Sequence, residues 1–411
     1  MDLFDKKRDE VNALFSSRDK YDEKKYVIRN VCEENFIRAL KSGKCVLVRG
    51  ISGSGKTWLT KHILKDTDYE LINLAKANKA GSIDACFAEK IGKIKTEYEE
   101  SISASAGVGP LRGEGISTSK YIWAEDLYEQ FLKRRKLEYI VFDNFETIIN
   151  NDKVINELGS IITMSDDEDI QKYNTKIILV GANNDIKRLF DRLPNYETIS
   201  NRIYELPEIK GFDYQECLGF INSSFEKLNF NVTKLDSFSR YILNNTRGVP
   251  QSVKDFCYQI AVIFLKNKHL TIDMNDKSSL KLLKLAEEEW LKVSFLSDYS
   301  IISNLYWDNI SHDKKNNYIL FQIQEDDMVE VSVDRLYANM TVYFPNLDKE
   351  LPSKKRVAEY LKSISDSSNN CNILEQRSDS IYSVRNTKIL LCMRLMLYLE
   401  EDEVCIVNLD E

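Results

Sequence analysis

The sequence has little histidine and no paired cysteine motif. Its 411 residues include three widely separated histidines, His62, His269 and His312, and eight cysteines, no two of which have the C-x-x-C spacing. A zinc site or a disulfide framework normally shows such close spacing. We therefore expect neither, and we interpret the cysteines as buried thiols in a reducing compartment.

Long apolar runs and excess positive charge are also absent. No stretch approaches the roughly 18 apolar residues of a membrane-spanning helix, and the first residues, MDLFDKKRDEVNALF, lack the apolar segment of a secretion signal. We therefore predict a cytoplasmic protein without a membrane partner. Because the formal net charge is -8, no broad positive field promotes non-specific nucleic-acid binding, so any such contact must be local.

Three apolar runs alternate with helical patterns in the first half of the chain. They are Cys45–Gly50, Tyr139–Phe145 and Lys176–Asn183. Continuous apolar runs are typical of strands that are buried on both faces of a parallel sheet, and their alternation with helices indicates an α/β fold. The length suggests two or three domains of roughly 150 residues.

The rest of the pattern divides the chain into four parts. Amphipathic helices follow the last apolar run, and three further helices, near Tyr318–Gln324, Val333–Asn339 and Lys354–Ser363, precede a strand–turn–strand pattern. Helices followed by a small hairpin are typical of a winged helix. The predicted parts are an N-terminal helical arm (1–24), a P-loop core (25–210), a helical lid (211–295) and a winged-helix-like C-terminal domain (296–411).

A glycine loop with a specific spacing follows the first apolar run. The segment GISGSGKT, residues 50–57, matches G-x-x-x-x-G-K-[ST] between a predicted strand and a predicted helix. In this motif, backbone N–H groups cradle phosphates, the lysine (Lys56) reaches the β- and γ-phosphates, and the threonine (Thr57) binds Mg²⁺. We predict an ATP site comprising Gly50, Ser52, Gly53, Ser54, Gly55, Lys56, Thr57 and Trp58; the alternative is a fortuitous glycine loop.

Polar residues end the next two apolar runs. Asp143 closes YIVFD and is predicted to hold Mg²⁺ together with Thr57. Glu146 is the predicted base for the attacking water, because a carboxylate suits that task; the alternative is that it forms only a surface salt bridge. Asn183, at the end of the third run, is predicted to contact the γ-phosphate or the water.

Between residues 26 and 290 the sequence resembles a known family. The segments GANNDIKRLF and SNRI, followed by an apolar, proline-containing strand and a helical lid, resemble the initiator branch of AAA+ ATPases (origin-recognition and helicase-loader proteins) and STAND-like ATPases. The resemblance implies self-association, with Arg202 as an arginine finger that points at the nucleotide of a neighbouring subunit. An ordinary surface arginine is the alternative, and Arg188 and Arg192 lie close by. It also implies that Tyr26 and Arg29 lie in a segment that passes the adenine base.

Two positions depart from the family pattern. Asn144 stands where AAA+ proteins usually have the glutamate base, which is why Glu146 is the predicted base. In the lid, Gln251 takes the place of an arginine that contacts nucleotide, and Arg247 is the candidate substitute.

The C-terminal domain and one insertion suggest partners. Lys354, Lys355 and Arg356 begin the predicted recognition helix, where basic residues can meet nucleic-acid phosphates, but the acidic flanking sequence favours contact with an unidentified protein partner. The glycine-rich segment 99–120 reads as a surface hairpin or a partner-contacting insertion.

The predicted function is an ATP-binding and ATP-hydrolysing switch that couples nucleotide state to oligomerisation or to engagement of a partner protein. One alternative is a DNA-binding initiator- or transposition-type ATPase that uses the winged helix. A small-molecule kinase is disfavoured, because such enzymes are usually one compact domain and roughly 200 residues follow the core here.

Overall fold

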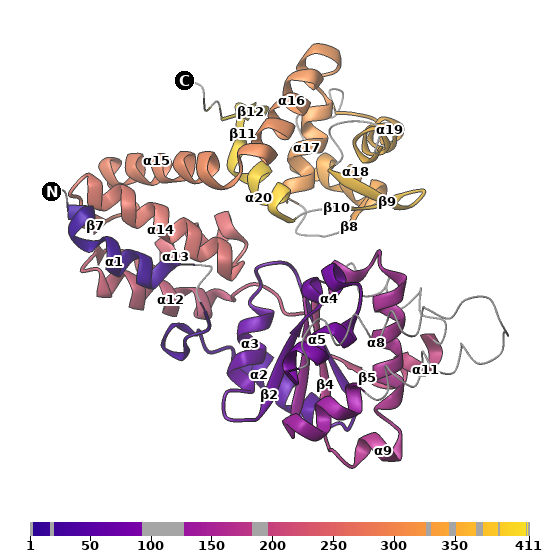
Figure 1. Ribbon diagram of the computed structural model, residues 1–411. Helices are drawn as coiled ribbons and strands as arrows, with labels where there is room; N and C mark the ends of the chain where they lie inside the picture. Colours follow the sequence, from indigo (N-terminus) through magenta and orange to yellow (C-terminus); the bar gives the residue numbers. More distant parts are fainter. Residues whose placement is uncertain are drawn as a thin grey trace. The chain divides into compact units, whose positions relative to one another are not determined.

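The computed structural model describes residues 3–16, 20–92, 127–182, 196–325, 330–344, 351–366, 373–384, 387–407 and 409 (Figure 1). Its contacts divide the chain into two units, Lys20–Lys210 and a second unit that combines Met1–Asp19 with Gly211–Glu411. The glycine-rich segment 99–120 and Asn183 lie outside the described residues.

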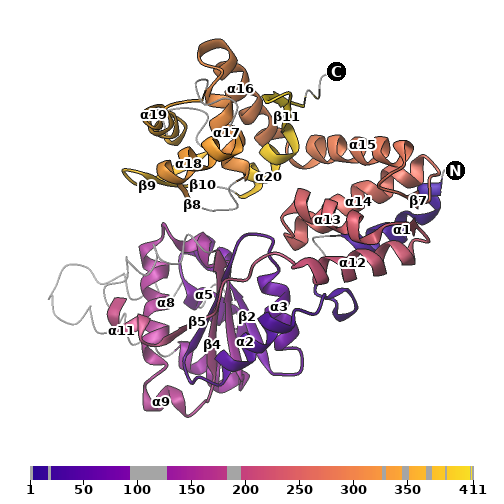
Figure 2. The same ribbon diagram turned by 180° about the vertical axis from the view of Figure 1, so that it is seen from behind.

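The unit Lys20–Lys210 is built on a five-stranded parallel sheet (Figure 2). Its strands have the order β2-β3-β4-β1-β5. They are β1 (Cys45–Gly50), β2 (Tyr69–Asn73), β3 (Tyr139–Asp143), β4 (Lys176–Ala182) and β5 (Ile203–Glu205). The predicted α/β class with a parallel sheet is therefore confirmed, and β2 is a strand that the sequence did not predict.

Helices cover both faces of this sheet (Figure 1). The helices of the unit are η1 (Glu23–Lys25), α2 (Asn30–Leu40), α3 (Lys56–Ile63), α4 (Leu74–Ala80), α5 (Ile83–Lys90), η2 (Phe145–Ile148), α8 (Asp152–Met164), α9 (Glu168–Gln171), α11 (Tyr196–Ser200) and a helical segment at 127–135. Along β1, Val46 and Val48 pack against α2 and α3, whereas Cys45 and Leu47 pack against the layer of α4, α5 and α8. This alternation follows from the two-residue period of a strand.

Because the strands are parallel, their carboxyl ends meet at one edge. The register pairs Gly50 with Ala182 and Asn73 with Asp143. Four strands thus present their last residues at the edge where ligands bind in open parallel sheets, and the helices α3, α4 and η2 begin there after β1, β2 and β3.

The second unit begins with the N-terminal helix. Helix α1 (Leu3–Phe15) packs on the helical layer made by α12 (Tyr214–Lys227), α13 (Leu235–Thr246), α14 (Pro250–Lys266) and α15 (Lys277–Ser294), with the short strands β6 (Asn231–Val232) and β7 (Thr271–Ile272). Phe15 is buried, and its ring lies 5.7 Å from that of Phe225. Helix α1 therefore shares a core with the predicted lid.

The C-terminal part contains a small antiparallel sheet of order β8-β10-β9. Its elements are α16 (Leu296–His312), α17 (Asn316–Glu325), β8 (Glu330–Ser332), α18 (Val333–Tyr343), α19 (Lys354–Ser365), β9 (Leu374–Ser378), β10 (Ile381–Val384), α20 (Thr387–Met396), β11 (Leu397–Glu400) and β12 (Glu403–Ile406). The three predicted helices correspond to α17, α18 and α19. None of the described helices is long and apolar enough to cross a membrane.

Candidate nucleotide-binding site

The glycine loop connects the end of β1 to the start of α3. Gly53 and Gly55 adopt positive φ angles of 79° and 88°, which favour glycine, and Gly55 is the N-cap of α3. A Cβ on Gly50 would lie 2.4 Å from the carbonyl oxygen of Ile209, so only glycine fits there. The sequence thus builds a tight turn that leads into a helix N-terminus, which is the local structure that cradles phosphate.

Lys56 folds back over this loop. Its Nζ donates hydrogen bonds to the carbonyl oxygens of Gly50 and Ile51, both at 2.9 Å. Burial lowers the pKa of Lys56, while the negative charges of Glu146, Asp143 and Glu208 act in the opposite direction. The structure therefore brings three carboxylates near the loop lysine, and Glu208 is one that the sequence did not single out.

Thr57 and Asp143 meet beside the loop. The Thr57 hydroxyl donates to Oδ2 of Asp143 at 3.0 Å, and Asp143 is only 7% exposed. Burial raises the pKa of Asp143, whereas the hydrogen bonds from the Asn144 N–H and from Thr57 oppose that rise. The Thr57 hydroxyl and the Asp143 carboxylate thus form a donor pair, that is, two neighbouring oxygen ligands for a metal ion.

This donor pair fits Mg²⁺. The ion prefers oxygen ligands and typically takes only one or two carboxylates, with waters and substrate phosphates in its other positions. Among the described residues no group of three or more histidine, cysteine, aspartate or glutamate side chains is arranged to hold a metal. The site therefore suits a metal that arrives with a phosphate ligand.

Asn144 has a special backbone conformation and a partner on β2. Its φ is 61°, in the left-handed region, where asparagine is better tolerated than most residues. Its backbone N–H donates to Asp143 Oδ1 at 2.9 Å, and its side-chain Nδ2 donates to Oδ1 of Asn73 at 3.1 Å. Asn73, at the end of β2, thus orients the residue that follows Asp143. Asn73 was not predicted, because the short segment YELIN does not have a clear strand pattern.

Glu146 lies on η2, directly after this turn. Its Oε2 accepts a hydrogen bond from the backbone N–H of Ala182 at 3.2 Å. Gly181 makes room for this approach, since a Cβ there would lie 2.7 Å from Phe145 Cβ and 3.4 Å from Glu146 Oε2. The carboxylate is partly buried at the end of β4 and close enough to influence Lys56, so it belongs to the same edge of the sheet.

An aromatic group flanks the helix that follows the loop. The rings of Tyr26 and His62 stack with centroids 3.9 Å apart, Tyr21 lies edge-on to Trp58 at 5.5 Å, and the Tyr21 hydroxyl is 2.9 Å from His62 Nδ1. The Tyr26 hydroxyl also donates to Glu33 Oε1 at 3.0 Å. Tyr21 and His62 therefore connect Tyr26 to Trp58 of α3, a link that the sequence had not indicated.

Arg29 is only 4% exposed and points into the unit. One of its terminal nitrogens donates to the carbonyl oxygen of Ser54 in the glycine loop at 2.9 Å, and the other donates to the carbonyl oxygen of Lys210 at 2.8 Å. In this position the guanidinium contacts the loop from within the protein.

Arg202 lies at the opposite edge of the sheet, where the parallel strands begin. Its backbone carbonyl accepts from Cys45 N–H at the start of β1, whereas the glycine loop follows the end of β1. Its side chain forms an ion pair with Asp166 at 2.6 Å and donates to the carbonyl oxygen of Thr198 at 2.7 Å. It is therefore not part of the glycine-loop site of this chain. Arg188 and Arg192 lie outside the described residues.

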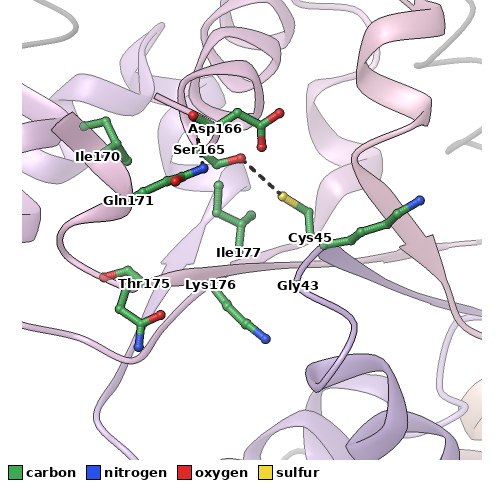
Figure 3. Close-up of a pocket in the computed structure, with 11 residues that line it drawn as sticks. Gly43, Cys45, Ser165, Asp166, Ile170, Gln171, Thr175, Lys176 and Ile177 are labelled. Carbon is green, nitrogen blue, oxygen red and sulfur yellow. Dashed lines mark hydrogen bonds between the residues drawn. The ribbon is translucent and has the colours of Figure 1, made fainter. Parts of the chain in front are cut away.

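A pocket also lies at that edge (Figure 3). Its walls come from the starts of β1 and β4 and from the segment between α8 and β4, and Cys45 Sγ faces the Ser165 hydroxyl at 4.0 Å. Burial raises the pKa of Cys45 to about 11, so the thiol stays protonated near neutral pH. The lining residues are Gly43, Lys44, Cys45, Ser165, Asp166, Ile170, Gln171, Asn174, Thr175, Lys176 and Ile177. None of them belongs to the glycine loop.

The predicted basic residues of α19 have acidic neighbours. Lys354 forms an ion pair with Asp334, Lys355 lies 3.8 Å from Glu359, and Arg356 lies 3.3 Å from Asp313. These ion pairs reduce the positive potential that a phosphate would meet.

The two lid positions also have distinct surroundings. Arg247 donates a hydrogen bond to the backbone carbonyl of Gln324 on α17, and Gln251 is exposed on α14.

Comparison with known proteins supports the assignment of the fold. Residues 38–190 match the family model described as an AAA domain. Comparison with curated proteins finds no match. Among solved structures, the Walker-type ATPase paby2304 of Pyrococcus abyssi is similar at a TM-score of 0.52 and 17% identity, covering 93% of this chain and 99% of that one. At this identity, the similarity bears on the fold alone.

Two other solved structures are less similar. The ORC2 protein of Aeropyrum pernix in its ADP form has a TM-score of 0.47 at 10% identity, covering 93% of this chain and 97% of that one. Cdc6p of Pyrobaculum aerophilum has a TM-score of 0.43 at 11% identity, with the same coverage. The match to the AAA domain model spans residues 38–190, and the parallel sheet and the glycine loop of this region agree with it.

Proposed function

We propose that this chain binds ATP with Mg²⁺ at Gly50–Thr57, hydrolyses it, and uses the nucleotide state to control self-association or engagement of a partner protein. The observation that carries the proposal is the pairing of Thr57 with Asp143 beside a glycine loop whose lysine already faces inward. The glycine loop, helix α3 and strand β3 each contribute to this arrangement, so a fortuitous glycine turn does not account for it.

Each of the residues at this site has a distinct chemical role in the proposal. Backbone N–H groups at the start of α3 and the ammonium of Lys56 would hold the phosphates, whose charge would replace the two loop carbonyls that Lys56 now contacts. Mg²⁺, when bound by Thr57 and Asp143, would neutralise charge on the phosphate oxygens. Glu146 would accept a proton from water; its position at the end of β4, on the same edge as Lys56, supports this role.

A direct test compares ATP hydrolysis by the wild type and by Asp143→Asn, with and without Mg²⁺. We expect hydrolysis to need Mg²⁺ and the variant to lose most of it while retaining nucleotide binding, because the amide keeps the shape of Asp143 and loses its charge. Asp152→Asn, an exposed aspartate on α8, is the matched control. Equal Mg²⁺-dependent activity in Asp143→Asn would reject Asp143 as the metal ligand, and an inactive wild type would reject the ATPase.

Self-association is supported by the position of Arg202. Since this arginine lies at the edge of the sheet opposite its own glycine loop, its side chain can serve a nucleotide only in another subunit. Contact with phosphate would require it to exchange Asp166 for the new anion. In the free subunit, the ion pair with Asp166 would therefore hold the Arg202 side chain.

The C-terminal part is the proposed partner-binding region. Its element order, α17-β8-α18-α19-β9-β10, with β10 between β8 and β9, supports a winged-helix-like domain. A protein partner is favoured because the three basic residues at the start of α19 have acidic neighbours.

DNA binding by this winged-helix-like region is the second candidate function, and salt dependence separates the two. If α19 binds DNA, affinity falls steeply with added salt, and joint replacement of Lys354, Lys355 and Arg356 by glutamine reduces that slope. We expect no specific DNA binding and therefore no such change. Replacing exposed lysines elsewhere, such as Lys281 and Lys284 on α15, controls for a general loss of charge.

A further inference from the structure

Arg29 joins two segments that are far apart in the sequence. It lies 25 residues before Ser54 and 181 residues before Lys210, and its guanidinium donates to the backbone carbonyl of each. Ser54 is fully buried within the glycine loop, and Lys210 is the last residue of its unit. A single side chain therefore fixes the phosphate-binding loop to the point where the chain leaves that unit.

We propose that Arg29 is a positioning residue that transmits the state of the glycine loop to the Lys210–Gly211 link, and through it to helix α17. The inference rests on the proposed ATP binding and goes beyond it by naming the residues that carry the signal. Arg29 does not contact nucleotide through its guanidinium in this role.

The chemistry of arginine suits this role. Its guanidinium is planar and rigid, so two carbonyls bonded to its terminal nitrogens keep a fixed relation to each other. Because the group is buried, losing either bond would leave a charged donor unsatisfied, which is costly. A movement of Ser54 on nucleotide binding is therefore expected to move Lys210, or to break a buried hydrogen bond.

The segment before Lys210 has little freedom. Ile209 N–H donates to the carbonyl of Arg49 at 2.8 Å, and the Ile209 carbonyl lies against Gly50, where a Cβ would approach to 2.4 Å. The segment that ends at Lys210, here called the exit segment, thus lies along the end of β1. This contact ties it to the start of the glycine loop, as Arg29 ties it to Ser54.

The segment after the link is held just as closely within the second unit. A Cβ on Gly211 would lie 2.7 Å from the Arg247 carbonyl oxygen, and Phe212 N–H donates to the Gly248 carbonyl at 2.6 Å. Arg247, which caps α13 with a φ of 51°, donates in turn to the Gln324 carbonyl on α17. Lys210 and Gly211, which the link joins, are therefore each held by contacts within their own unit.

Hydrogen–deuterium exchange of the full-length protein, with and without saturating ATP and Mg²⁺, tests this coupling. In the wild type we expect ATP to slow exchange in the loop (50–63) and also in 211–216, 245–250 and 316–325, by about fivefold or more in these distant segments. In Arg29→Gln, measured at an ATP concentration that again protects the loop, the slowing in the distant segments should fall below about twofold.

Further variants distinguish coupling from a structural role. Gly211→Ala leaves the glycine loop untouched and should also remove the distant effect, whereas Gly219→Ala, where a Cβ meets nothing within 4 Å, and Arg38→Gln on α2 should retain it. If Arg29→Gln does not fold by circular dichroism, Gly211→Ala decides the question.

The outcomes separate the coupling from the proposed function. Distant slowing that persists in a folded Arg29→Gln or in Gly211→Ala, or that is absent from a wild type whose loop is protected, would overturn the coupling. If ATP does not protect even the loop of the wild type, ATP binding itself is rejected, and the coupling with it.

Discussion

The hydroxyl of Thr57 and the carboxylate of Asp143 lie 3.0 Å apart although 86 residues separate them in the sequence. The first belongs to the helix that follows β1 and the second ends β3, and β4 lies between these strands in the sheet. The pair therefore forms only when β3, β4 and β1 lie side by side in their native order. Removing either oxygen is expected to impair metal-dependent steps more than folding.

Lys56→Ala is expected to weaken ATP binding severely. The ammonium is the loop's only side-chain cation, and loss of a charge-assisted hydrogen bond costs about 2 to 3 kcal/mol, or about 30- to 150-fold in Kd. Isothermal calorimetry measures the change, with Lys61→Ala on the same helix as the control. An unchanged affinity would remove the loop from the nucleotide site.

Glu146→Gln is expected to bind ATP as tightly as the wild type and to lose turnover by about a hundredfold or more. Glutamine keeps an oxygen that can accept from Ala182 N–H but has no basic carboxylate. Single-turnover hydrolysis and a separate binding assay distinguish the two effects. If turnover is normal, Glu146 only supports the end of β4, and Asn144, held by Asn73, becomes the residue that orients water.

If Arg202 acts on the nucleotide of a neighbouring subunit, ATP hydrolysis should depend on assembly. Hydrolysis per molecule should rise with protein concentration, and Arg202→Ala should abolish the rise. A mixture of Lys56→Ala and Arg202→Ala subunits should recover part of the activity, because some interfaces join an intact loop to an intact arginine. Activity that is constant on dilution, together with an inactive mixture, would leave Arg202 as a partner of Asp166 alone.

Asp84, on α5, is expected to make the free energy of unfolding depend on pH. Burial, and to a lesser extent the charge of Glu157, raise the pKa of Asp84 from 3.8 to about 7. Over this range the folded state binds more protons than the unfolded state, so this group lowers stability progressively as pH rises from about 4 to about 7.

Asp84→Asn replaces the carboxyl by a group that does not ionise, so the loss of stability that Asp84 causes as pH rises should disappear. The variant should unfold at a higher temperature than the wild type at pH 8, and the difference should shrink as the pH approaches 4. Thermal unfolding at both pH values measures it. Asp66→Asn, which changes an exposed aspartate, should show no such trend, and a pH-independent difference for Asp84→Asn would show that the carboxylate is not the cause.

The sequence by itself determined the glycine loop, the strand before it and the carboxylate at Asp143. These features are local: GISGSGKT needs only its own glycines and the following helix, and YIVFD is a continuous apolar run that a buried strand explains. The same local reasoning predicted α17, α18 and α19, because each has helical periodicity of its own.

The tertiary structure decided which distant residues complete the site. Strand β2 (YELIN) carries Glu70 within a short run, so its pattern did not reveal a strand, and Asn73 was missed with it. The roles of Arg29, Arg202 and the basic residues of α19 depend on partners far away in the chain, such as Lys210 for Arg29 and Asp334 for Lys354. Hydrogen bonds and ion pairs act over a few ångströms in space, and the folded chain, through its strand order and helix packing, determines which side chains come within that distance.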